Sequence, residues 1–119
     1  MKEYSFEKLD AWQKAKDLTI CLYKVTSEFP GTEKFGLTSQ LRRAAVSVSS
    51  NLAEGSSRTT GKDQGRFYSM AYSSAVEILN QLIISKELDF LTKGDYKELR
   101  SEIEDITAML NRLHKSTQD

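Results

Sequence analysis

Hydrophobic and polar residues follow one another along most of this chain with a period of three to four positions, the spacing of one face of an α-helix. Four segments carry the pattern, at about residues 6–29, 38–57, 61–88 and 93–115. Short runs rich in Gly, Ser and Thr separate them, as is typical of turns. No segment shows the every-second-residue alternation of a β-strand. The pattern therefore predicts an all-α protein with four helices.

The first and last helices each present one continuous apolar seam. The seam of the first comprises Ala11, Ala15, Leu18, Leu22, Val25 and Phe29, and that of the last comprises Tyr96, Leu99, Ile103, Ile106, Leu110 and Leu113. Pro30 and Gly31 end the first helix. Because the connections are short, we expect an antiparallel up-down four-helix bundle that forms a single domain over residues 1–119.

Three threonines are predicted to cap helices at their N-termini. Thr38 precedes the second helix, and its hydroxyl oxygen is expected to accept a hydrogen bond from an unpaired backbone N–H group. Thr60 and Thr92 each stand three residues before an aspartate, Asp63 and Asp95, a spacing that resembles a capping box. Asp63 also lies near the positive end of its helix dipole, which favours a carboxylate there.

The second helix contains few large hydrophobic residues, and three strips of side chains run along it. They are a core stripe of Leu41, Ala45, Val48, Leu52 and Gly55, a strip of mainly short side chains with Arg42, Val46, Ser49 and Ala53, and a polar stripe of Arg43, Ser47, Ser50, Asn51, Glu54 and Arg58. Short side chains allow a neighbouring helix to approach closely. The alternative is a solvated face, although such faces are usually filled with Lys, Glu and Gln, which are better helix formers than Ser.

The polar stripe has two interpretations. As ordinary surface it holds an exposed i, i+4 pair of Glu54 and Arg58, which contributes about 0.3–0.5 kcal/mol. At a subunit interface or a pore, Arg43, Asn51 and Glu54 form a polar network that sets the register or contacts a ligand.

The third helix has two apolar faces, whereas a helix that packs on one core needs a single face. The second face consists of Tyr72, Val76, Leu79 and Ile83. Either another subunit covers it, or the helix is central in its own bundle. Glu77 and Gln81 offer further polar groups on this helix. The candidate residues of a subunit interface are therefore Ser47, Ser49, Asn51, Ala53, Glu54, Tyr72, Val76, Glu77, Leu79, Gln81 and Ile83.

Seventeen basic and seventeen acidic residues cancel, so no net charge draws the protein to nucleic acid or to an anionic membrane. The charges are segregated, however. Residues 34–66 hold six basic and two acidic residues, and residues 87–105 hold seven acidic and three basic ones. The basic segment of one protomer is expected to meet the acidic segment of the next, which favours a closed ring. The candidate contacts with nucleic acid are Arg42, Arg43, Arg58, Lys62 and Arg66.

The chain lacks the residue patterns that are typical of an enzyme. The one histidine, His114, does not supply the Glu-x-x-His pairs of a di-metal bundle, and the glycines around residue 61 lack the spacing of a phosphate-binding loop. Cys21 and His114 have no reason to meet as nucleophile and base. Glu54 and Glu77 are a conjectural acid–base pair. We expect a non-enzyme with no catalytic residue, metal, cofactor or small-molecule substrate.

The composition of the chain indicates the cellular compartment in which the protein works. Hydrophobic residues make up 39% and charged residues 29% of the chain, as in a helical protein with a charged surface. The single cysteine, Cys21, cannot form an internal disulfide, which fits a reduced compartment. The N-terminus does not have the pattern of a signal peptide, and no uncharged run approaches about 20 residues. We expect a cytoplasmic protein without a membrane partner.

Several motifs together resemble a known family. They are "DAWQKA" at residues 10–15, "FGLTSQLRRAAVSVSSNLAEGSSR" at residues 35–58 and "FYSMAYSSAVEILNQL" at residues 67–82. With Phe29-Pro30 and Glu33, they resemble the four-helix-bundle family named for proteins encoded in intervening sequences of 23S ribosomal RNA. Ser73, Leu79 and Asn80 depart from the residues common in that family.

The resemblance implies a left-handed antiparallel four-helix bundle that assembles as a ring of five subunits. It extends to accessory proteins of diversity-generating retroelements, which are strongly basic and bind nucleic acid with a reverse transcriptase, whereas this chain is neutral. The leading hypothesis is a non-enzymatic homo-oligomeric scaffold or adaptor with RNA or an RNA-handling protein as its partner. The alternatives are a nucleic-acid-binding accessory protein that acts with a reverse transcriptase or another RNA-handling enzyme, and a protein–protein adaptor without nucleic-acid contact.

Overall fold

The computed structural model describes residues 1–118 of the chain. It contains the four α-helices α1 (Asp10–Thr26), α2 (Leu37–Ser56), α3 (Gly61–Glu87) and α4 (Lys93–Ser116), with two short 3-10 turns, η1 (Ser5–Lys8) and η2 (Gly31–Glu33). Within these described residues the fold is all-α, without a β-strand. None of the four helices is long and apolar enough to cross a membrane.

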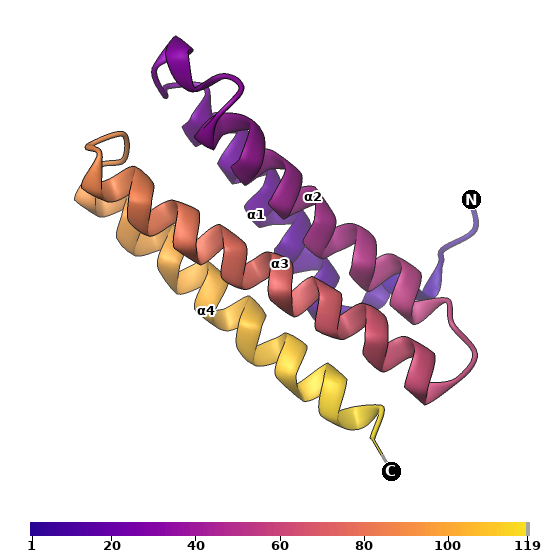
Figure 1. The fold of residues 1–119 in the computed structure, drawn as a ribbon. Coiled ribbons are helices and arrows are strands. Elements are labelled where there is room, and N and C mark those ends of the chain that lie inside the picture. The colour runs from indigo at the N-terminus through magenta and orange to yellow at the C-terminus, as the bar shows by residue number, and fades with distance from the viewer. Residues whose placement is uncertain (119) are drawn as a thin grey trace.

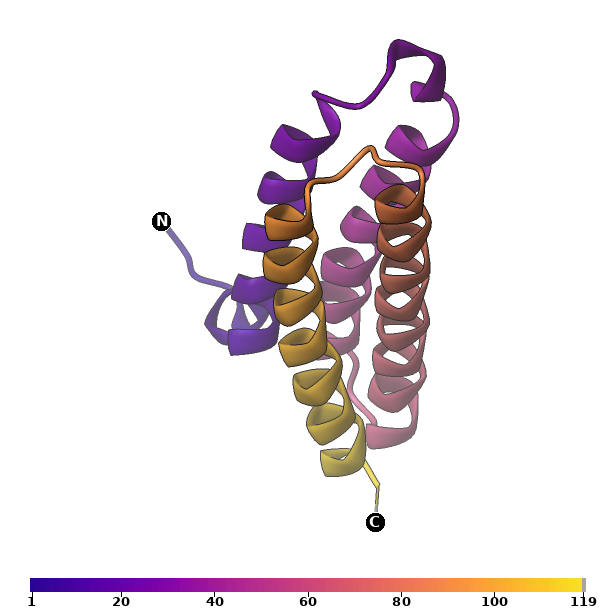
Figure 2. The same cartoon turned by 90° about the vertical axis from the view of Figure 1, so that its left-hand side faces the viewer.

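The four helices form one elongated body of 44 × 32 × 23 Å. In Figure 1, α2 and α3 lie side by side at the front, with α1 behind α2 and α4 behind α3. Each helix contacts the next along the chain, and α1 also contacts α4, so the four enclose a common core. Figure 1 shows the N-terminal segment and the α2–α3 connection towards the same end of the body, and Figure 2 shows η2 at the end opposite the α2–α3 connection.

The predicted apolar seams supply most of this core. The large side chains with no exposed surface are Leu22, Leu41, Leu52, Ile78, Leu82, Ile103, Ile106 and Leu110. Tyr96 and Leu113, at the two ends of the α4 seam, are half-buried and pack against the core. Burial of such a side chain contributes roughly 1.5–3 kcal/mol, and the helices are held together mainly by these contacts.

The first helix is shorter than its apolar pattern predicts. It begins at Asp10 rather than near Phe6, because residues 5–8 form the separate turn η1 and Leu9 has an extended backbone, with φ −74° and ψ 123°. It ends at Thr26, and the chain then turns so that Phe29 is buried outside the helix, with its ring centroid 5.7 Å from that of Phe90. Burial of Phe29 explains the apolar signal beyond the helix end.

Two of the three predicted caps are present. The hydroxyl oxygens of Thr60 and Thr92 accept hydrogen bonds from the backbone N–H groups three residues on, at 3.1 and 3.0 Å. The cap at Thr38 is wrong, because α2 begins earlier, with Gly36 at the N-cap position. Oε1 of Glu33 accepts the Leu37 N–H at 3.1 Å instead, and a Cβ on Gly36 would lie only 2.6 Å from that oxygen.

Candidate functional site

Short side chains of α2 lie directly against α3 of the same chain. Oγ of Ser47 and Oγ of Ser74 are 2.8 Å apart, and Nδ2 of Asn51 donates to the carbonyl and the hydroxyl oxygens of Ser47 at 2.9 and 3.1 Å. A larger side chain at Ser47 or Ser74 would push the two helices apart. Close packing inside one chain therefore accounts for this part of the Ser-rich helix.

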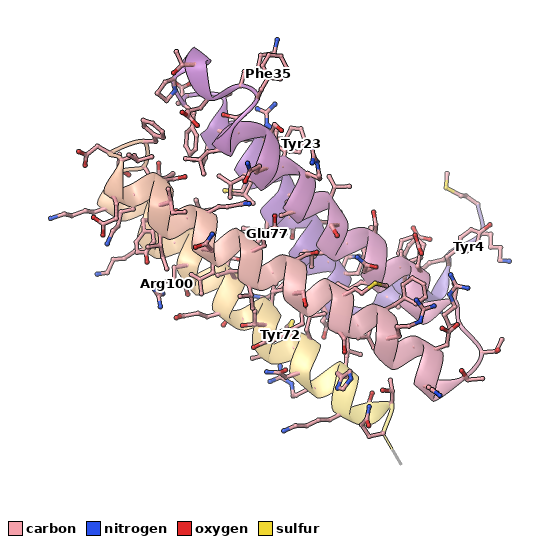
Figure 3. All side chains as sticks on the ribbon, viewed as in Figure 1. Tyr4, Tyr23, Phe35, Tyr72, Glu77 and Arg100 are labelled. Carbon is pink, nitrogen blue, oxygen red and sulfur yellow. The ribbon has the colours of Figure 1, made fainter. Side chains whose placement is uncertain are left out.

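A second polar contact joins the same two helices nearer to the η2 end. Nε2 of Gln81 donates to Oε1 of Gln40 at 3.3 Å and to Oε1 of Glu77 at 3.2 Å. Gln81 is only 3% exposed, whereas Glu77 is exposed on the outer side of α3. Figure 3 shows Glu77 near the middle of the bundle, where α2 borders α3. Ser47, Asn51, Glu77 and Gln81 therefore make contacts within the chain, and their role between subunits stays a prediction.

The second apolar face of α3 is divided between core and solvent. Tyr72 and Leu79 are half-buried and pack against the core of this chain. Ile83 is also half-buried, and Val76 is 44% exposed. The bundle itself thus explains part of this face, and Val76 is the member most open to a second subunit.

On α2, the remaining candidate interface residues differ in exposure. Ser49 and Ala53 are half-buried, in the same strip as Arg42, which bonds to α1. Glu54 is exposed, and one of its carboxylate oxygens lies 3.8 Å from NH2 of Arg58.

The five candidate nucleic-acid contacts do not form one surface. Arg42 joins α2 to α1: its Nε donates to Oγ1 of Thr26 at 2.9 Å, its NH2 donates to the Tyr23 carbonyl at 3.1 Å, and its guanidinium lies 4.5 Å from the Tyr23 ring centroid. Arg43 is exposed on α2, 13 residues before the helix ends at Ser56, which is about 20 Å along the axis.

Arg58, Lys62 and Arg66 do come together at the α2–α3 connection, and we call them the cationic turn. The guanidinium carbons of Arg58 and Arg66 lie 4.5 and 4.6 Å from the ring centroid of Phe67. Asp63 pairs with both, at 3.8 Å from Arg58 and 2.9 Å from Arg66. These ion pairs offset part of the positive charge, while all three cationic side chains keep exposed surface.

The sequence interpretation missed an aromatic cluster at the same end of the molecule. Ring centroids of Tyr4 and Phe6 are 6.4 Å apart, and those of Phe6 and Trp12 are 4.9 Å apart. Nζ of Lys2 lies 4.9 Å from the Tyr4 centroid, and Nζ of Lys16 lies 5.6 Å from that of Trp12. The signal was present in the sequence, because aromatic residues and lysines are interleaved over the first 16 positions.

Glu54 and Glu77, the candidate acid–base pair, lie far apart in the structure. Gln81 donates to both Glu77 and Gln40, so Glu77 lies close to Gln40. Gln40 is 14 residues, or about 21 Å, from Glu54 along α2. Glu54 and Glu77 therefore do not share a site. Among residues 1–118, no group of three or more His, Cys, Asp or Glu side chains is arranged to hold a metal ion.

Cys21 lies in a groove of about 800 Å³ between α1 and α4, beside Glu98 and Glu102. Burial, followed by the negative charges of Asp95, Glu102 and Glu98, raises the pKa of the Cys21 thiol. A raised pKa disfavours the thiolate, which is the nucleophilic form of cysteine. The groove is therefore unsuited to activating Cys21.

The chain is similar to a solved structure of the same fold. It is the crystal structure of a protein of unknown function from the S23 ribosomal protein family of Bacteroides thetaiotaomicron, with a TM-score of 0.80 and 18% sequence identity. The match covers 88% of this chain and 98% of that chain, and at this identity it supports the fold alone. No curated protein matches the chain.

Comparison with protein families places the chain more closely. The family model described as "23S rRNA-intervening sequence protein" matches residues 7–112, which include all of α1, α2 and α3 and most of α4. The match also includes the contacts between α2 and α3 that explain the small-residue helix. The chain therefore belongs to the family of 23S rRNA-intervening sequence proteins.

Proposed function

We propose that this protein is a non-enzymatic scaffold or adaptor that works as a homo-oligomer of antiparallel, left-handed four-helix bundles. The family resemblance favours a ring of five subunits. The start of α3 lies close to the end of α4, because a Cβ on Gly61 would lie 2.8 Å from the Thr117 carbonyl oxygen. This closeness supports the antiparallel arrangement. The free thiol of Cys21 fits a reduced, cytoplasmic location.

The observation that carries the proposal is the exposed apolar surface on the outer side of α3. Met70, Val76 and Ile84 are 38%, 44% and 41% exposed. At about 100° per residue they fall within roughly 120° of the helix circumference, so one neighbouring helix is wide enough to cover them. Removal of this surface from water stabilises an assembly by about 25 cal/mol per Å².

Light scattering on the purified protein tests the assembly. The wild type is expected to have the mass of an oligomer, and the double variant Val76→Glu/Ile84→Glu is expected to shift to the monomer because two carboxylates would be buried at the interface. Ala108→Glu, at an exposed position of α4, is the matched control and should leave the mass unchanged. A wild type that is monomeric at all concentrations would refute the proposal.

A second candidate function is nucleic-acid binding, either alone or beside a reverse transcriptase or another RNA-handling enzyme. The cationic turn favours it, because three exposed cationic side chains meet at one end of the bundle. Binding through phosphates weakens with salt, with a slope of about −0.7 per phosphate contact for a single strand. Absence of binding at about 50 mM salt would leave the protein–protein adaptor, which predicts a partner retained at high salt.

A further inference from the structure

Three aromatic rings stand in a row at the N-terminal end of the chain, in the order Tyr4, Phe6 and Trp12. Tyr4, at the outer end of the row, is 56% exposed, and Phe6 and Trp12 are half-buried. A lysine ammonium group lies near the ring at each end, from Lys2 over Tyr4 and from Lys16 over Trp12. Lys2 is thus close enough to pair with a phosphate of a ligand that stacks on the rings, whereas Lys16 is paired with Asp17 at 3.7 Å and donates to Oε1 of Gln13 at 3.1 Å.

Hydrogen bonds hold the row against the bundle. Oε2 of Glu7 accepts the Tyr4 N–H at 2.7 Å, and Nε2 of Gln13 donates to the Glu7 carbonyl at 2.8 Å. The turn η1, which contains Phe6, contacts both α1 and α2. The rings are therefore positioned before any ligand arrives, which lowers the entropy lost on binding.

The row and the cationic turn lie towards the same end of the molecule. Figure 3 shows Tyr4 towards the end of the molecule that carries the α2–α3 connection and Phe35 at the opposite end, and η1 contacts α2. Lys8 and Lys16 are paired with Glu3 and Asp17, each at 3.7 Å, and neither is counted among the available cations. This end of the bundle combines the exposed ring of Tyr4 with the cation Lys2 and those of the cationic turn.

We propose that this end binds single-stranded nucleic acid, with bases stacked on the row that Tyr4 begins and phosphates paired with the cationic turn. Aromatic faces beside a cationic surface are the combination that sequence-tolerant single-strand binding uses, because every base has a π-face. Bases of a duplex are stacked on one another and cannot lie on a protein ring. The proposal deepens the nucleic-acid candidate above and rests on it.

Tyr4 is the residue to change, because its ring is exposed and its backbone N–H, which bonds Glu7, remains in any variant. The test measures binding of a labelled oligouridine of about 12 nucleotides, and of a duplex of the same length, by fluorescence anisotropy at about 50 mM salt. Tyr4→Ala is expected to weaken single-strand binding by about fivefold or more. Tyr4→Phe, which keeps the ring, should bind like the wild type, as should Phe35→Ala, which removes an 87% exposed ring at the other end.

Salt dependence separates stacking from charge. Tyr4→Ala should leave the slope of log affinity against log salt unchanged, whereas Lys62→Gln should lower its magnitude by about 0.7. Trp12 is the only tryptophan of the chain, so the intrinsic emission of the protein reports on the row itself. Saturation with oligouridine is expected to quench it.

Two results would overturn the aromatic inference while leaving the cationic turn as a nucleic-acid site. They are Tyr4→Ala binding within about twofold of the wild type, and unchanged Trp12 emission at saturation. Absence of any binding by the wild type at about 50 mM salt would overturn both. Circular dichroism of each variant confirms that it is folded, and none of these outcomes bears on the oligomer, whose test is the mass.

Discussion

Oγ of Ser47 on α2 and Oγ of Ser74 on α3 lie 2.8 Å apart, although the two residues are 27 positions apart in the chain. Both side chains are half-buried, and the bond lies where the two helices face each other. A helix pair with serine on both sides of its contact can approach closely without leaving a hydroxyl group unpaired. This contact is the physical reason for the small side chain at position 47 of α2.

Replacement of Ser74 by Leu should therefore destabilise the bundle. The larger side chain has to displace α2 or adopt a strained rotamer, which typically costs about 1–3 kcal/mol, and it also removes one of the two hydrogen-bond partners of the Ser47 hydroxyl group. The measurement is the free energy of unfolding in urea. Ser73→Leu, at the adjacent exposed position, is the control and should change stability by less than about 0.5 kcal/mol.

Gly55 is expected to resist substitution even though alanine is the better helix former. A Cβ there would lie 2.8 Å from Cε1 of Tyr68 and 3.0 Å from Cβ of Phe67, and both side chains are buried. Gly55→Ala should thus lower the unfolding free energy by about 1–2 kcal/mol despite its gain of about 1 kcal/mol in helix propensity. Gly94→Ala, where the new Cβ would lie 3.9 Å from Oγ1 of Thr92, should be neutral or stabilising in the same urea titration.

Arg42 is expected to act in stability rather than in nucleic-acid binding. Arg42→Gln removes the guanidinium that bonds Thr26 and stacks on Tyr23, and the loss should be about 1–3 kcal/mol in unfolding free energy. Arg43→Gln, one position along and exposed, should change stability by less than about 0.5 kcal/mol. Oligouridine affinity of a folded Arg42→Gln protein close to the wild-type value would agree with this role, and a large loss of affinity would contradict it.

The Cys21 thiol should alkylate slowly, because burial and the neighbouring carboxylates raise its pKa. A thiol with a raised pKa is less ionised at any given pH, and the thiolate is the reacting form. The midpoint of the rate of iodoacetamide modification against pH is expected to lie above that of the same protein unfolded in urea. Glu98→Gln/Glu102→Gln should lower this midpoint, because both carboxylates raise the pKa of the thiol. A folded-state midpoint at or below the unfolded one would disprove the explanation.

The raised pKa of the Cys21 thiol also makes the stability of the protein depend on pH. A thiol whose pKa is higher in the folded state than in the unfolded chain contributes stability below the unfolded pKa, and that contribution is lost as the pH rises through the folded pKa. Unfolding free energy should therefore fall on the alkaline side of the unfolded cysteine pKa. Cys21→Ala removes this part of the pH dependence.

Much of the fold could be predicted from the sequence, because the helices and their caps depend on the spacing of residues that are close together in the chain. The seam of α4 and the caps at Thr60 and Thr92 involve residues within one or two turns of each other, and the structure contains them as predicted. The start of α1 was misplaced because the pattern registers burial, whereas the separate turn η1 depends on a hydrogen bond to the side chain of Glu7. Thr38 was misread for a similar reason, since Glu33 reaches over from η2.

The candidate surfaces were less predictable, because a residue type does not specify its partner. Arg42 and Arg58 have the same charge, yet one is bonded to α1 and the other lies on Phe67. Tyr4 contributes little to a helical pattern, and its place in the proposed binding surface follows from the ring of Phe6 beside it.

The sequence by itself determined that this protein has four amphipathic helices with short connections, because a period of about 3.6 residues and the turn formers between helices act over a few positions. Only the tertiary structure decided which polar side chains meet, since contacts such as Gln40 with Gln81 join residues 41 positions apart. The rotation of each helix about its axis brings such groups together. Packing of the whole core sets that rotation, and no local pattern contains it.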